Sequence, residues 1–85
     1  MEIFIKVAPP HFDRLRSRIP VESPAYEAIA KATRIDHSFE GVFFKGYTIP
    51  CDQNQARIIL EIARQCCPEI IPTIEQAMRL ARPRR

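Results

Sequence analysis

The residues of this chain best suited to covalent chemistry are its three cysteines, Cys51, Cys66 and Cys67. Cys51 directly precedes a predicted helix, whose dipole would favour the thiolate. Together with His37 and Asp36, Cys51 would form a constellation for nucleophilic catalysis, since a nearby base activates a thiol, although the spacing in sequence does not establish contact. A thiol-dependent enzyme using Cys51 is therefore our third hypothesis. The alternative is that Cys51 fills a gap at the end of a strand.

The adjacent pair Cys66 and Cys67 matches neither the C-x-x-C redox spacing nor a zinc-ligand pair. Both residues continue the apolar stripe of a predicted helix, and free cysteine is often buried. We expect two small buried side chains near the end of that helix. An odd number of cysteines without regular spacing also argues against a disulfide framework, so reduced thiols are expected.

The remaining polar residues predict no cofactor and no metal site. His11 and His37 are isolated, and no H-x-x-x-H pattern connects them, so we expect surface histidines in connecting segments. The ten acidic residues are scattered singly beside basic ones, as on a solvated surface. Gly41 and Gly46 are the only glycines, which excludes a glycine-rich phosphate-binding loop. We expect a protein that is not an enzyme.

The net charge of +3 lies in the C-terminal tail. Without Arg82, Arg84 and Arg85 the chain carries ten basic and ten acidic residues. Arginine clusters neutralise phosphates, so our second hypothesis is a regulator that binds nucleic acid weakly through the C-terminal arginines, Arg79, Arg82, Arg84 and Arg85. No helix-turn-helix, zinc-finger or RNP pattern supports it.

Length and composition predict one globular domain over residues 1–81, followed by a basic tail over residues 82–85. Apolar residues make up 46% of the chain and charged residues 27%, which is ordinary for a folded protein. No signal segment follows Met1, and no apolar run is long enough to cross a bilayer. We expect a cytoplasmic protein that makes no membrane contact.

Residues 42–67 form the unit around which the rest of the chain is organised. Residues 42–49 are rich in β-branched and aromatic types and predict a strand that ends at Pro50. Asp52, with Gln55 three residues later, predicts a capping box and a helix from Gln53. The apolar stripe of this helix contains Ala56, Ile59, Leu60, Ala63, Cys66 and Cys67, which makes it the centre of the expected core.

The N-terminal third predicts a strand and two helices. Residues 2–7 alternate in polarity, as in a half-buried strand. Pro9 and Pro10 fit the first turn of a short helix, which Pro20 closes. Ser23 and Pro24 form a cap and first-turn signature for a second helix over residues 24–34.

The other segments predict connections and a last helix. Residues 34–40 are polar and predict a connection, with a hairpin turning at Lys45 and Gly46 as the alternative. Residues 68–71 predict one tight turn, and residues 72–81 a helix with Ile74, Ala77, Met78 and Ala81 on one face.

These elements predict an α+β (or small α/β) fold in which a minimal two- to three-stranded sheet packs against about four helices, in the order β-α-α-β-α-α. So small a sheet has open edges, and apolar residues occur on both faces of its strands. Our first hypothesis is therefore a non-enzymatic protein–protein interaction or assembly module, acting as a homodimer or as an accessory subunit of a larger protein. Its expected interaction surface contains Phe4, Phe43 and Tyr47.

Overall fold

The protein has an α+β fold, which confirms the predicted class. The computed structural model describes the backbone of residues 2–39 and 42–81, and the side chains of these residues except 37–39 and 42–44. Its elements are β1 (Ile3–Val7), α1 (Pro9–Arg18), α2 (Pro24–Ala30), β2 (Thr33–Phe39), β3 (Val42–Cys51), α3 (Gln53–Cys66), a 3₁₀ helix η1 (Pro68–Ile70) and α4 (Ile71–Leu80).

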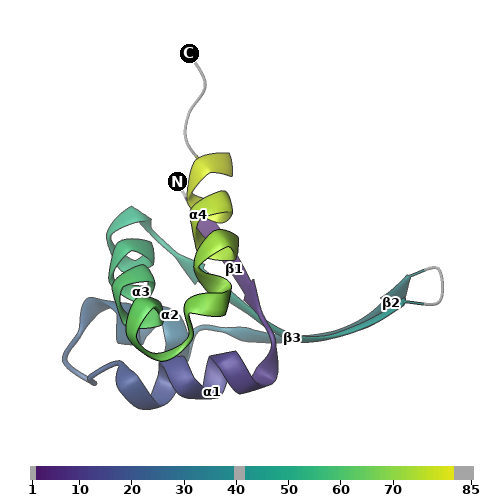
Figure 1. Cartoon of the computed structure of the whole chain (residues 1–85), viewed down its shortest axis with the longest axis horizontal. Coiled ribbons are helices and arrows are strands. Elements are labelled where there is room, and N and C mark those ends of the chain that lie inside the picture. The colour runs from purple at the N-terminus through teal and green to yellow at the C-terminus, as the bar shows by residue number, and fades with distance from the viewer. Residues whose placement is uncertain (1, 40–41, 82–85) are drawn as a thin grey trace.

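The three strands form one antiparallel sheet in the order β1-β3-β2, so β3 is the central strand. Residues 47–51 of β3 pair with β1, and residues 42–48 pair with β2. Among the described residues, the part of β3 before residue 47 therefore pairs with β2 alone. This part of β3 and the residues of β2 that pair with it extend from the body of the molecule as a two-stranded arm (Figure 1).

Among the described residues, helices cover only one face of the sheet. Ile3, Ile5 and Val7 of β1 are buried on that face, whereas Phe4 and Lys6 point to the opposite face and are exposed. Helix α3 lies at the centre of the helical layer and packs against α1, α2 and α4 (Figure 1). The described part of the chain therefore has two layers, with its core between them.

Local sequence signals fix where α2 and α3 begin, as predicted. The Asp52 carboxylate accepts a hydrogen bond from the Gln55 N–H at 2.7 Å, and the Asp52 N–H donates to Gln55 Oε1 at 2.9 Å. The Ser23 hydroxyl accepts a hydrogen bond from the Ala25 N–H at 3.2 Å, with Pro24 in the first turn of α2. These side chains satisfy N–H groups that the first helical turn leaves without a partner.

The predicted connection over residues 34–40 is wrong, because Thr33–Phe39 forms β2. Helix α2 accordingly ends at Ala30 rather than at residue 34. The alternative prediction of a turn at Lys45 and Gly46 is also wrong: β2 and β3 pair antiparallel, but Lys45 and Gly46 lie inside β3, where they pair with Asp36 and Ile35. Pairing with β3 stabilises β2 as a strand although its residues show only a weak apolar pattern. The contact between the strands therefore outweighs the local preference of this polar segment for a connection.

The strand predicted to end at Pro50 continues to Cys51. Proline is tolerated in a strand only where its missing N–H has no partner to lose. Pro50 is opposite Phe4 of β1, and β2 begins at Thr33, opposite Thr48, so that no residue of β2 reaches Pro50. The central strand can therefore carry a proline at this one place.

The C-terminal segment folds close to prediction. The expected tight turn is η1, and α4 runs from Ile71 rather than from Pro72. Ile74 is buried against α3 and the sheet, and Met78 lies half-buried beside it. No helix of the described residues has the length and apolar character needed to cross a membrane.

Truncating Ile59 to alanine should lower the free energy of unfolding by about 2–5 kcal/mol, because it opens a cavity in the core. Ile59 is fully buried in the middle of α3. The neighbouring Ile58 is only half-buried, so Ile58→Ala is the matched control and should cost less. Denaturant melts measure both losses, and equal losses would contradict this orientation of α3.

Candidate functional site

The environment of Cys51 keeps its thiol protonated. The side chain is 2% exposed, and its Sγ lies 3.6 Å from the backbone oxygen of Ile3, to which it donates. Burial raises the pKa of the Cys51 thiol to about 12, and the nearby carboxylates of Asp52 and Glu2 add to the shift. The helix dipole at this position does not offset those effects, so Cys51 lacks the low pKa that a nucleophilic thiol needs.

The structure does not bring Cys51, His37 and Asp36 together. His37 pairs with Phe44, and Asp36 pairs with Lys45, both in the arm. Cys51 is at the other end of β3, about 23 Å from Phe44 at 3.3 Å per residue. Within the described residues, the backbone therefore places Asp36 and His37 too far from Cys51 to activate its thiol.

Cys66 and Cys67 lie where α3 ends, as predicted. Cys67 is fully buried, as expected, but the prediction that Cys66 is also buried is wrong, because its side chain is only half-buried. Their Sγ atoms are 3.5 Å apart. Burial raises the pKa of the Cys67 thiol, and the hydrogen bond with Cys66 adds to this effect. Within the described residues, no group of three or more His, Cys, Asp or Glu side chains is arranged to hold a metal ion.

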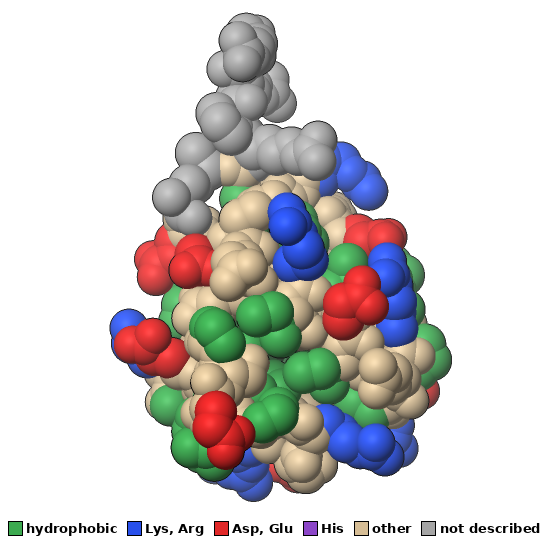
Figure 2. All heavy atoms as spheres, turned by 90° about the vertical axis from the view of Figure 1, so that its left-hand side faces the viewer, with side chains coloured by type: hydrophobic (Ala, Val, Ile, Leu, Met, Phe, Trp, Pro, Cys, Tyr) green, Lys and Arg blue, Asp and Glu red, His purple; other side chains and the backbone are tan. Residues whose placement is uncertain are grey.

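The predicted nucleic-acid contacts are largely outside the described residues. Arg82, Arg84 and Arg85 fall there, and Arg79 lies exposed near the end of α4 beside Glu75. Viewed from the side of α2 and α3, the surface carries basic and acidic side chains mixed with apolar ones (Figure 2). This face has no continuous basic patch of the kind that a nucleic-acid backbone would need.

The three predicted interaction residues do not share one surface. Phe4 is 54% exposed on the open face of the sheet. Tyr47 pairs with Val7 on the helical face, where its ring stacks on Phe12 of α1 at 4.0 Å between centroids. The side chain of Phe43 lies outside the described residues. Of the three, Phe4 alone is shown as exposed apolar surface, and Tyr47 anchors β3 to α1.

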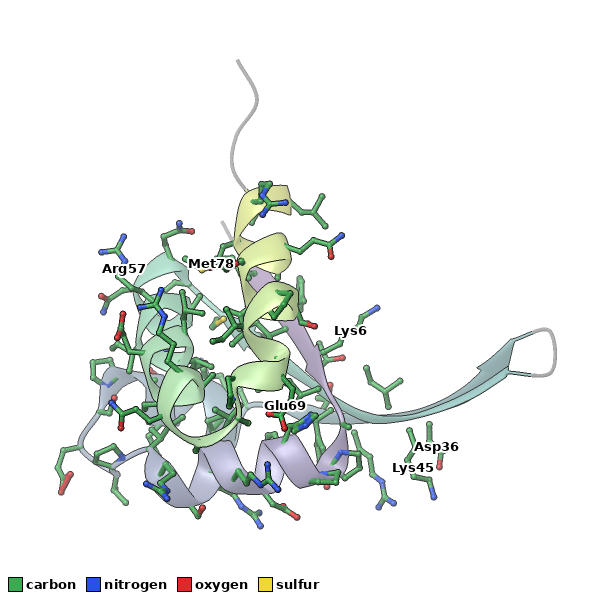
Figure 3. The ribbon with its side chains drawn as sticks, viewed as in Figure 1. Lys6, Asp36, Lys45, Arg57, Glu69 and Met78 are labelled. Atoms are coloured by element: carbon green, nitrogen blue, oxygen red, sulfur yellow. The ribbon has the colours of Figure 1, made fainter. Side chains whose placement is uncertain are left out.

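A groove of about 450 Å³ runs between β1 and α4, two elements that pack side by side. Its strand wall contains Glu2, Phe4 and Lys6. Figure 3 shows Lys6 projecting from β1 away from the helices. Its helix wall is formed by residues that recur at helical spacing along α4: Thr73, Gln76, Ala77, Leu80 and Ala81.

Exposed apolar side chains concentrate at this groove. Three large apolar side chains are exposed among the described residues, Phe4, Leu80 at 77% and Val21 at 72%. Two of the three line the groove. The sequence identified Phe4 by alternation but did not identify Leu80, whose signal was its place just outside the apolar stripe of α4.

The position of Pro50 indicates which backbone N–H and C=O groups of β1 point away from β3. Opposite residues in an antiparallel pair alternate between exchanging two backbone hydrogen bonds and exchanging none. Pro50 has no N–H, so its pair with Phe4 is of the second kind. Phe4 and Lys6 therefore direct their N–H and C=O groups away from β3, along the edge of the sheet. Such an edge is a template for another strand.

Comparison with protein-family models, with curated proteins and with solved structures finds no match to this chain.

A thiol reagent at pH 8 should label Cys66 first in the native protein, since Cys51 and Cys67 are buried. A thiol whose pKa is about 12 is ionised at that pH in about one molecule in 10,000. Cys51 and Cys67 should react only after unfolding. The Cys66→Ser variant should lose the fast phase, and prompt labelling of Cys51 in that variant would contradict its protonated state.

Proposed function

We propose that this protein is a non-enzymatic protein–protein interaction module whose docking site is the free edge of β1. One observation carries the proposal: β1 is an edge strand of the described sheet, and it borders a groove that Phe4 and Leu80 flank with exposed apolar surface. Extended segments commonly bind by adding a strand to such an edge, with neighbouring pockets that receive their side chains.

The dimensions of the groove suit an extended segment. β1 has five residues, which span about 16 Å at 3.3 Å per residue. An added strand of similar length would exchange main-chain hydrogen bonds with Phe4 and Lys6. Its side chains on one face would pack against Ala77 and Leu80 of α4, so an apolar residue is favoured there.

The chemistry of the cysteines also favours binding over catalysis. A nucleophilic thiol needs a depressed pKa or an adjacent base. The pKa of Cys51 is raised to about 12, and Asp36 and His37 lie in the distant arm. The partner strand belongs to another copy of the chain or to a larger protein, and we place this association in the cytoplasm.

Lys6→Pro should weaken the docking of an extended peptide without unfolding the protein. The Lys6 N–H faces the free edge, so proline removes a docking donor but no bond to β3. Lys6→Thr is the matched control, since it removes the same charge and keeps the N–H. The probe is a fluorescent peptide selected from a random library on the immobilised protein, and anisotropy measures its affinity.

The Lys6→Pro variant should bind this peptide at least about tenfold more weakly than Lys6→Thr. This loss corresponds to roughly one missing main-chain hydrogen bond together with the poor fit of the proline ring at the edge. Circular dichroism should show the same fold for both variants. Equal peptide affinities for the two variants would overturn strand addition at β1, and so would a library that yields no peptide dependent on this edge.

A further inference from the structure

The open face of β1 has a self-complementary pattern. Glu2, Phe4 and Lys6 occur at every second residue, with an acid and a base equally spaced on the two sides of an aromatic ring. Glu2 and Lys6 are both exposed, and no ion pair joins either to another residue in the described part of the chain. An antiparallel strand with the same sequence would present the opposite charge at each end.

We infer that the strand occupying the β1 edge is the β1 of a second copy, paired antiparallel about a two-fold axis at Phe4; this inference rests on the proposed function. The two sheets then form one six-stranded sheet in the order β2-β3-β1-β1-β3-β2. A two-fold arrangement of this kind closes after two copies, so it gives a dimer rather than a fibre.

The backbone geometry restricts the register of this pairing. Residues with outward N–H and C=O groups must face one another, and these are Glu2, Phe4 and Lys6. Centring the axis on Glu2 sets two acids opposite each other, and centring it on Lys6 sets two bases opposite each other. Only the axis at Phe4 pairs all three residues with outward groups of the second copy.

Side-chain chemistry favours the same register. Glu2 lies opposite the partner's Lys6, and by symmetry this pair occurs twice. Opposite charges directly across an antiparallel pair are favourable, whereas like charges are unfavourable. Phe4 packs beside the partner's Phe4, and on the helical face Ile3 lies beside the partner's Ile5. The partner's Phe4 thereby buries part of the Phe4 side chain, which is 54% exposed in the single chain.

Charge reversal tests both the partner and the register. In its own dimer, Glu2→Lys sets the introduced lysine opposite Lys6 twice, and Lys6→Glu sets the introduced glutamate opposite Glu2 twice. Each variant alone should therefore have a dimer dissociation constant at least about tenfold above that of the unmodified chain at low salt. Sedimentation equilibrium measures the constant, and circular dichroism checks that each variant is folded.

Two combinations serve as matched controls. A one-to-one mixture of the single variants sets the introduced lysine of one chain opposite the introduced glutamate of the other. The same mixture keeps the original pair of Lys6 with Glu2, so it should dimerise as well as the unmodified chain. The double variant should do the same. High salt should narrow the differences, because exposed charges are then screened.

Three results would overturn this inference. The first is an unmodified chain that stays at 9.8 kDa across the micromolar range. The second is a single variant that dimerises as well as the unmodified chain, since the register is then different. The third is a mixture that fails to restore the dimer. Peptide binding that Lys6→Pro weakens relative to Lys6→Thr would in each case still support the proposed docking edge, so the failure of this inference can be distinguished from the failure of the proposed function.

Discussion

The missing N–H of Pro50 is the constraint on which the arrangement of the sheet depends. The central strand carries this proline where β2 does not reach, and opposite Phe4 in a pair that exchanges no backbone hydrogen bonds. The same alternation assigns the outward backbone groups of β1 to Phe4 and Lys6. One residue in β3 thus determines which groups of β1 are free to bind.

Helix α3 organises the helical layer, because it contacts α1, α2 and α4. Its capping box fixes the start of the helix directly after β3, and its buried stripe holds α1, α2 and α4 on one face of the sheet. The opposite face is left without a helix among the described residues. Helix α4 contacts β1 from the helical layer, and the groove between the two elements is lined by the exposed side chains of Phe4 and Lys6.

The sequence predicted the helices well because their signals are local. Asp52, Ser23 and the paired prolines at residues 9 and 10 act within one turn of the helix that they start. β2 was missed because Thr33–Phe39 mixes charged and apolar residues, and it becomes a strand only through pairing with β3. The sequence predicts a strand end at Pro50, because whether a strand tolerates this proline depends on where the two neighbouring strands run.

The proposed docking site was only half predictable for the same reason. Alternation within β1 correctly placed Phe4 on the open face. Tyr47 was assigned to the same surface, but the register between strands places it on the helical face against Phe12. A shift of one residue in register exchanges the two faces, and residues within one strand do not reveal it. Leu80 joins Phe4 only through the tertiary contact of α4 with β1.

We propose that the outward amides of β1 are free in the single chain and become paired when a strand docks. Residue-resolved hydrogen exchange at increasing protein concentration measures this directly. At low concentration the amides of Phe4 and Lys6 should exchange rapidly, while those of Ile5 and Val7 are protected by β3. As dimer forms, Phe4 and Lys6 should gain protection together. Fast exchange at both positions in a fully dimeric sample would place the interface elsewhere and would contradict the docking of a strand at the edge of β1.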